Sequence, residues 1–211
     1  MRRVIAFAAV LVVLVLAWTN ASFLDERLAF SGHMALHLLV VAVAAPVLAF
    51  ALAGTSFDPS PRLPRLFAPL PASVLELAVV WGWHAPAARE AVALSGAVFA
   101  LEQAGFLLAG LVLWLAAFGG WRREPMAGGI VALLLTSMHM TLLGALLTLA
   151  PRPLYAPWLC LGGSALGPLA DQQTGGILML AVGGAVYLAG GLTLAARLLA
   201  EGPLRPEGGT E

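Results

Sequence analysis

The sequence predicts an all-α membrane protein, a polytopic bundle of about six transmembrane helices with both chain ends in the cytoplasm. Of its 211 residues, 61% are hydrophobic and 10% are charged, whereas an ordinary soluble domain has about 25% charged residues. The apolar residues gather in runs near the length of roughly 20 residues that a helix needs to cross a bilayer. The arginines lie mainly in every second connection between these runs, which is typical of a chain that crosses repeatedly.

The predicted spans form one domain, residues 1–211, and cover residues 4–18, 28–52, 72–85, 96–118, 127–149 and 174–198. The first span is short and follows Arg2 and Arg3, so a cleaved signal peptide is the alternative, although only a poor cleavage site follows it near Thr19. The third span is also short and contains Glu76, which we expect to reach the cytoplasmic interface. Prolines fill the second and fifth connections, where no helix is expected to continue.

The arginines predict the orientation, because short cytoplasmic connections carry the excess of positive charge. With the N-terminus inside, eight arginines are cytoplasmic: Arg2, Arg3, Arg62, Arg65, Arg122, Arg123, Arg197 and Arg205. Three lie outside: Arg27, Arg89 and Arg152. The net charge is zero, so no bulk charge indicates binding of nucleic acid.

All four histidines fall at the middle of the membrane or on its outer side. His33 and His37 are four residues apart in the second span and therefore share one helix face, which Met34 can flank. His84 ends the third span, and His139 lies near the middle of the fifth, between Met138 and Met140.

Ionisable groups in hydrocarbon are costly, so they usually face the bundle interior and serve a site or a pathway. Imidazole and thioether groups together suit a soft metal, above all Cu(I). Because Cys160 is the only cysteine, no pair of thiolates is present to form a tight structural zinc site. The sequence therefore predicts a copper site, open to the outer face, with His33, Met34, His37, His84, Met138 and His139 as candidate ligands.

Each candidate also has a simpler interpretation. His139 could hydrogen-bond across helices, His84 could belong to an interfacial aromatic belt, and the methionines could be packing residues. Glu102 could relay protons or stay a neutral buried acid, and Asp171 could cap the sixth helix. Cys160 could be an extra soft ligand or an incidental loop residue.

Three stretches resemble the membrane-embedded cytochrome c oxidase assembly factors associated with caa-type oxidases. The first is SGHMALHLL at residues 31–39, followed by Ala45 and Pro46. The second is WHAP at residues 83–86, followed by Glu102 and Phe106. The third is LLGALLTLAPRPLY at residues 142–155, followed by LADQQ at residues 169–173. The resemblance runs from about Ser31 to Leu199, and the order and spacing of the three motifs make it specific.

The resemblance implies an all-helical protein of the bacterial plasma membrane that takes part in oxidase assembly, with copper supply as the supposed activity and an oxidase subunit as partner. It implies metal-site positions at His33, Met34, His37, His84 and His139, and an outer-loop signature at Asp171 and Gln172. Members of the family often have Glu-His where this chain has Glu102 and Gln103, which leaves the number of coppers open.

Two other functions stay open from the residues. One is a transporter of copper or protons, with Glu102 and His139 along its path. The other is a membrane cytochrome in which paired histidines such as His37 and His139 ligate haem iron. No nucleophile elbow, phosphate-binding loop or zinc-protease motif occurs, so no enzymatic activity is expected. Glycine pairs indicate close helix contacts, which leaves a homo-oligomer open beside contacts with lipid.

Overall fold

The computed structural model describes residues 2–19, 21–118, 123–160 and 166–200, and this part of the chain contains helices and no strand. Four of the helical segments are long and apolar enough to cross a membrane: Ala29–Leu52, Gly96–Phe118, Met126–Leu149 and Pro168–Ala200. The all-α class and the membrane-protein character predicted from the sequence are therefore confirmed for these four segments.

Two of the four long segments are interrupted by a π-helix. The first consists of α2 (Ala21–Leu38) from Ala29 onward, η1 (Leu39–Ala44) and α3 (Ala45–Leu52). The last consists of α8 (Pro168–Leu178), η3 (Met179–Gly183) and α9 (Gly184–Ala200). The other elements are α1 (Arg2–Thr19), α4 (Pro69–Trp83), α5 (Pro86–Leu94), α6 (Gly96–Phe118), α7 (Arg123–Leu149) and the 3-10 turn η2 (Pro157–Cys160).

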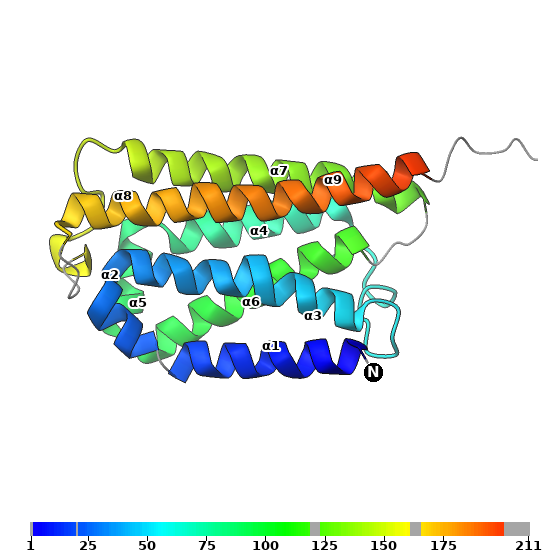
Figure 1. Ribbon diagram of the computed structural model, residues 1–211, viewed down its shortest axis with the longest axis horizontal. Helices are drawn as coiled ribbons and strands as arrows, with labels where there is room; N and C mark the ends of the chain where they lie inside the picture. The colour runs from blue at the N-terminus through cyan, green and yellow to red at the C-terminus, as the bar shows by residue number, and fades with distance from the viewer. Residues whose placement is uncertain (1, 20, 119–122, 161–165, 201–211) are drawn as a thin grey trace, which may run out of the picture.

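The helices run along the long axis of one bundle, and α1 and α4 follow the same direction as the longer segments (Figure 1). Helix α7 packs against α9, α8 and α4, while α6 packs against α4 and α3. Helix α1 lies at the edge of the bundle against α3. Short α5 lies across one end of the bundle next to α6.

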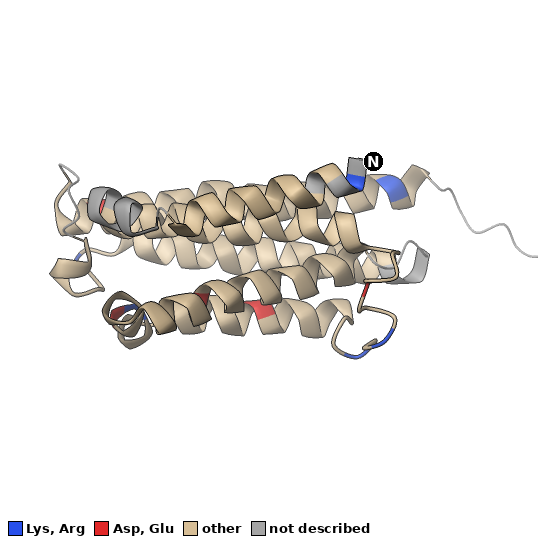
Figure 2. Cartoon of the chain, turned by 90° about the horizontal axis from the view of Figure 1, so that it is seen from below, with Lys and Arg blue, Asp and Glu red and all other residues tan. Residues whose placement is uncertain are grey.

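The two ends of the bundle differ in charge (Figure 2). The start of α1 with Arg3, the connection after α3 with Arg62 and Arg65, and the end of α9 with Arg197 lie at the same end of the bundle, which we name the arginine end. The opposite end, which we name the histidine end, carries α5, η2 and the first turn of α8.

The connection at the arginine end is ordered by a buried carboxylate. Asp58 accepts hydrogen bonds from the backbone N–H groups of Gly54 at 2.8 Å and Ser60 at 2.9 Å. Burial acts to raise the pKa of Asp58, but the hydrogen bonds from Ser60 and Gly54 and the charge of Arg62 hold it below its ordinary value. The carboxylate therefore stays ionised and keeps this turn closed.

Two expectations about individual helices are wrong. Glu76 is fully buried and does not reach an interface, because its side chain points from α4 into the bundle. The last helix begins at Pro168 and not at residue 174, since Pro168 occupies a first-turn position where its missing N–H is not needed. The residues Asp171 and Gln172 are therefore helical.

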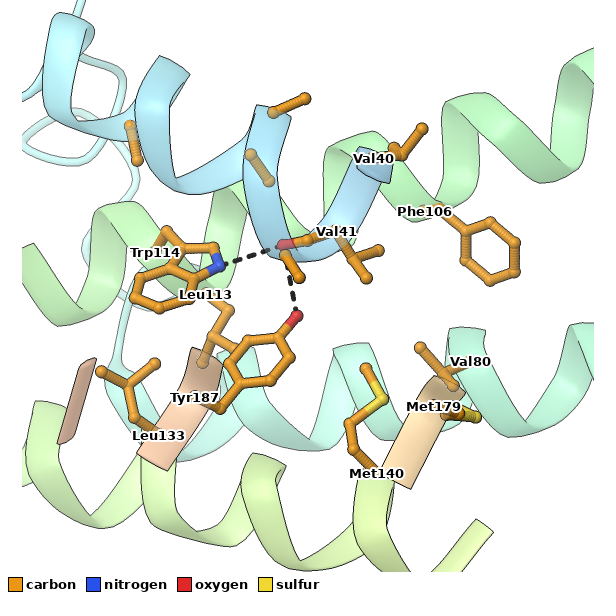
Figure 3. Packing of buried hydrophobic residues seen from close by; sticks show 14 of the residues in the cluster. Val40, Val41, Val80, Phe106, Leu113, Trp114, Leu133, Met140, Met179 and Tyr187 are labelled. Carbon is orange, nitrogen blue, oxygen red and sulfur yellow. Dashed lines mark hydrogen bonds between the residues drawn. The ribbon is translucent and has the colours of Figure 1, made fainter. Parts of the chain in front are cut away.

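A proline explains the first π-helix. Its turn pairs the N–H of Ala45 with the carbonyl of Val40, so the next such bond would need an N–H on residue 46. Pro46 has none, which leaves the carbonyl of Val41 without that donor. The indole Nε1 of Trp114 donates to this oxygen at 3.2 Å and the hydroxyl of Tyr187 lies at 3.4 Å from it (Figure 3). Side chains from α6 and α9 thus meet at one backbone atom.

Glycines set the distance between α7 and α8. A Cβ atom added to Gly176 would lie 2.5 Å from Oγ1 and 2.8 Å from the backbone nitrogen of Thr148, and 2.8 Å from the carbonyl oxygen of Gly144. One added to Gly144 would lie 2.7 Å from the nitrogen of Leu180. Small residues of this kind allow helix backbones to approach closely in membranes.

We expect Gly176→Ala to lower the free energy of unfolding by about 1–3 kcal/mol, the typical cost of overpacking a tight interior. The unfolding midpoint in detergent, followed by circular dichroism, measures the effect. Gly82→Ala is the matched control, because nothing lies within 4 Å of its added Cβ atom. Equal stability of the two variants would contradict the close packing of α7 and α8.

Candidate metal centre

Three helices bring a group of buried polar side chains together near the histidine end. Helix α2 supplies His33, Met34 and His37, and His84 directly follows α4 as its C-terminal cap. Helix α6 supplies Glu102 and Phe106. Each of these side chains is at most 7% exposed. The i, i+4 spacing of His33 and His37 therefore does place both on the bundle interior.

The ring of His84 is held in one tautomer by the backbone. Its Nδ1 lies 2.6 Å from the carbonyl oxygen of Val80, and a carbonyl can only accept, so Nδ1 carries the proton. The lone pair of Nε2 then faces the sulfur of Met34 at 3.4 Å. Two electron-pair donors with no proton between them are arranged to share a cation. Metal-bound histidines commonly donate their other N–H to a carbonyl in this way.

His37 lies beside this pair and is fully buried. Its ring centroid is 5.3 Å from that of His84 and 4.0 Å from that of Phe106. Neither of its ring nitrogens has a hydrogen-bond partner among the described residues. An imidazole buried without a partner is costly, and a metal ion between His37 and His84 would remove that cost.

His33 belongs to a separate chain of hydrogen bonds that reaches the edge of the bundle. Its Nε2 lies 3.0 Å from Oε1 of Glu102. The amide of Gln103 donates to Oε2 of the same carboxylate at 3.2 Å, and the indole of Trp18 donates to the amide oxygen of Gln103 at 3.2 Å. Gln103 thus connects Glu102 to α1.

Asp171 fixes the start of the second membrane segment. Its carboxylate accepts the backbone N–H groups of Phe30 at 2.9 Å and Ser31 at 3.3 Å. Immediately before them Ala29 has φ 46°, a left-handed conformation rare for a residue with a side chain. The prediction that Asp171 caps its own helix is therefore wrong, because Gly167 holds that cap position and Asp171 caps the kinked helix that carries His33 and His37.

Two further residues hold the connections around the cluster. Gln172 accepts the N–H of Leu154 at 2.7 Å and donates to the carbonyl of Leu147 at 3.2 Å. Tyr155 donates its hydroxyl to the carbonyl oxygen of His84 at 2.9 Å and packs against Phe30. Sequence reasoning assigned Tyr155 no role, although it ends the APRPLY run that was singled out.

Other predicted site residues lie elsewhere. His139 is buried on α7, and neither of its ring nitrogens has a partner in the described part of the chain. Met138 is 67% exposed on the outside of the bundle.

Cys160 is buried in η2, where burial raises the pKa of its thiol to about 11. A thiol that stays protonated at neutral pH is a poor metal ligand. Among the described residues no three His, Cys, Asp or Glu side chains gather as a ligand set. A metal centre here therefore depends on the thioether of Met34 beside His37 and His84.

The family model of the cytochrome c oxidase caa3 assembly factor matches residues 1–201. The chain belongs to this family. No curated protein and no solved structure matches the chain significantly. The membership confirms the resemblance seen in the three motifs. In the structure, residues of these motifs lie around one cluster: His33, Met34 and His37 on α2, His84 after α4, Tyr155 on the connection before α8, and Asp171 and Gln172 in α8.

We expect Asp171→Ala to lower the free energy of unfolding by about 2 kcal/mol or more, because it leaves two buried N–H groups without an acceptor. Asp171→Asn keeps one acceptor oxygen and should lose less. Thermal unfolding in detergent, followed by tryptophan fluorescence, ranks the two variants. If Asp171→Ala unfolds at the same temperature as the parent, the carboxylate does not hold the kinked helix.

Proposed function

We propose that this assembly factor binds Cu(I) between His37, His84 and Met34 and delivers it to a cytochrome c oxidase subunit in the membrane. One observation carries the proposal: the lone pair on Nε2 of His84 faces the sulfur of Met34 at 3.4 Å, while His37 lies beside them with no partner of its own. Copper is the cargo of this activity.

The donor set favours copper over harder metals. Two imidazoles and a thioether are neutral, soft or borderline ligands, and thioether sulfur selects Cu(I). Metal–nitrogen bonds of about 2.0 Å and metal–sulfur bonds of about 2.3 Å, as zinc makes them, span the distance between His84 and Met34 at a near-tetrahedral angle. Neutral ligands also mean that the bound cation is the only charge of the set.

Delivery requires that the copper can leave. Three donors leave one coordination position for a ligand from the receiving subunit, so that transfer can proceed by ligand exchange. Glu102 engages Nε2 of His33, which leaves the other ring nitrogen of His33 to accept copper on its way in or out. This activity breaks and forms metal–ligand bonds only, and we propose no enzymatic reaction.

The proposal includes the topology. We infer that α1 and α4 also cross, which gives six spans in the bacterial plasma membrane with both chain ends in the cytoplasm. The cluster then lies in the outer half of the bilayer, next to the side on which the copper arrives. The unequal charge of the two ends of the bundle supports this orientation.

Copper binding is tested by metal analysis of the purified protein after anaerobic incubation with Cu(I). We expect about one copper per chain in the parent, and loss of that copper in His37→Gln. His139→Gln is the matched control, because it replaces a second buried histidine whose ring nitrogens also have no described partner. Met34→Leu removes only the sulfur and should weaken copper binding at unchanged fold.

Retention of copper by His37→Gln, or its loss in His139→Gln, would show that the ligands are not the ones proposed. Absence of copper from the parent together with a Soret band would favour the haem-binding alternative.

The topology is tested by labelling single cysteines in intact cells with a membrane-impermeant thiol reagent, in a Cys160→Ala background. Leu94→Cys should be labelled and Phe57→Cys should not, because the two exposed positions lie at opposite ends of the bundle. Permeabilised cells supply the control in which both react. Labelling of Phe57→Cys in intact cells would reverse the proposed orientation.

A further inference from the structure

A second buried acidic group lies closer to the arginine end, outside the copper ligands. Glu76 is fully buried on α4, eight residues before His84. Its Oε1 makes a hydrogen bond with the hydroxyl of Tyr187 from α9. Its other oxygen, Oε2, has no hydrogen-bond partner among the described residues. The family motifs and the proposed copper site leave this group without a function.

The number of protons available to the contacts of Tyr187 indicates the protonation state of the Glu76 carboxyl group. The hydroxyl of Tyr187 has one proton and lies near two acceptors, the carbonyl of Val41 at 3.4 Å and Oε1 of Glu76. A carbonyl can only accept, so a bond to Val41 uses the proton of Tyr187. The contact with Glu76 then needs a second proton, and only the carboxyl group can supply it. A protonated Glu76 satisfies both contacts, whereas an ionised Glu76 satisfies one.

The surroundings also disfavour an ionised carboxylate. No arginine or lysine occurs in residues 29–52, 69–83, 96–118, 126–149 or 168–196. The titratable groups on the described helices around Glu76 are Tyr187 on α9, His139 on α7 and Glu102 on α6. His37 and His84 lie nearer the histidine end. Arg89 on α5 and Arg197 in the last turn of α9 lie near opposite ends of the bundle. A buried charge without a counter-charge is costly in hydrocarbon.

A metal cation is the other ligand that a carboxylate could bind, and the neighbouring oxygens do not suit it. The carbonyl of Val41 already faces both Trp114 and Tyr187 (Figure 3). The hydroxyls of Ser73 and Thr136 hydrogen-bond to each other at 3.0 Å, and the hydroxyl of Thr136 also lies within reach of the carboxyl group of Glu76. A cation would therefore have to rearrange existing hydrogen bonds to be coordinated here, whereas a proton needs only the carboxyl oxygens and Tyr187.

We propose that Glu76 is a proton-binding site in the half of the bundle nearer the arginine end, and that its proton is released when a cation binds between His37 and His84. Val80 separates Glu76 from His84 on one buried face of α4, and Val41 lies one turn from His37 on the facing helix. The coupling between Glu76 and the cation rests on the proposed copper site, whereas the assignment of a proton to Glu76 does not.

The distance between Glu76 and His84 along α4 determines how strongly the proton and the bound cation affect each other. Eight helical residues correspond to about 12 Å. At an effective dielectric constant of about 20, two unit charges at that distance interact strongly enough to change an affinity about tenfold. Release of the proton leaves a negative charge that partly balances the bound copper, so copper should bind more tightly to the parent than to Glu76→Gln as the pH rises.

Infrared spectroscopy of the copper-free protein in liposomes tests the proton directly. We expect a carbonyl stretch of a protonated carboxylic acid at neutral pH, shifted by exchange into heavy water and missing in Glu76→Gln. Glu102→Gln is the matched control and should keep this band. Tyr187→Phe should keep the band at a shifted frequency, because the acid loses its hydrogen-bond partner but not its proton. An unchanged spectrum in Glu76→Gln would overturn the proposal, and so would a sodium-dependent unfolding temperature that Glu76→Gln abolishes.

The coupling is measured by Cu(I) titrations of the parent and Glu76→Gln at increasing pH. The ratio of the two dissociation constants should rise towards about ten. A ratio that stays at one over the whole range would overturn the coupling. A parent that keeps the carboxylic acid band but binds no copper would contradict the copper site and not the proton site.

Discussion

The hydrogen bonds from Phe30 and Ser31 to the carboxylate of Asp171 determine where the second membrane segment begins. A helix leaves its first N–H groups without partners inside the helix, and in hydrocarbon no water can take them. By accepting two of these groups from a different helix, Asp171 stabilises the left-handed turn at Ala29 and sets the register of everything after it. His33, Met34 and His37 face α4 and α6 only in that register.

Most of the buried polar groups at the histidine end likewise have a hydrogen-bond partner from another part of the chain. Tyr155 satisfies the carbonyl of His84, Gln172 satisfies Leu154, and Glu102 satisfies His33. Two described exceptions on the facing surfaces of α2–η1 and α4 are the ring of His37 and Oε2 of Glu76. Since native structures leave few buried polar groups unpaired, we expect a ligand at each of these two side chains, a soft cation at His37 and a proton at Glu76.

Much of the fold follows from composition and periodicity, because hydrocarbon allows few ways to satisfy a backbone. The clustering of His33 and His37 on an interior face also followed from their spacing. The depth of Glu76 was predicted wrongly because distance from a helix end does not show which way a side chain points. The role of Asp171 was missed because its partners are about 140 residues away, and local capping rules consider only the residue's own helix. The π-helix at η1 could not be predicted from the sequence. Pro46 removes one backbone N–H donor, but which carbonyl loses its partner depends on how Trp114 and Tyr187 pack around η1.

The chain of contacts from Trp18 through Gln103 and Glu102 to His33 has a practical consequence. The indole at its end lies on α1, the helix at the edge of the bundle, yet it is joined through the side chain of Gln103 to the carboxylate of Glu102 beside the histidine cluster. The emission of an indole depends on whether its N–H is hydrogen-bonded. Trp18 is therefore an internal fluorophore linked to the cluster, and because the chain has six tryptophans, the difference in emission between the parent and Trp18→Phe is the signal that follows a change at His33.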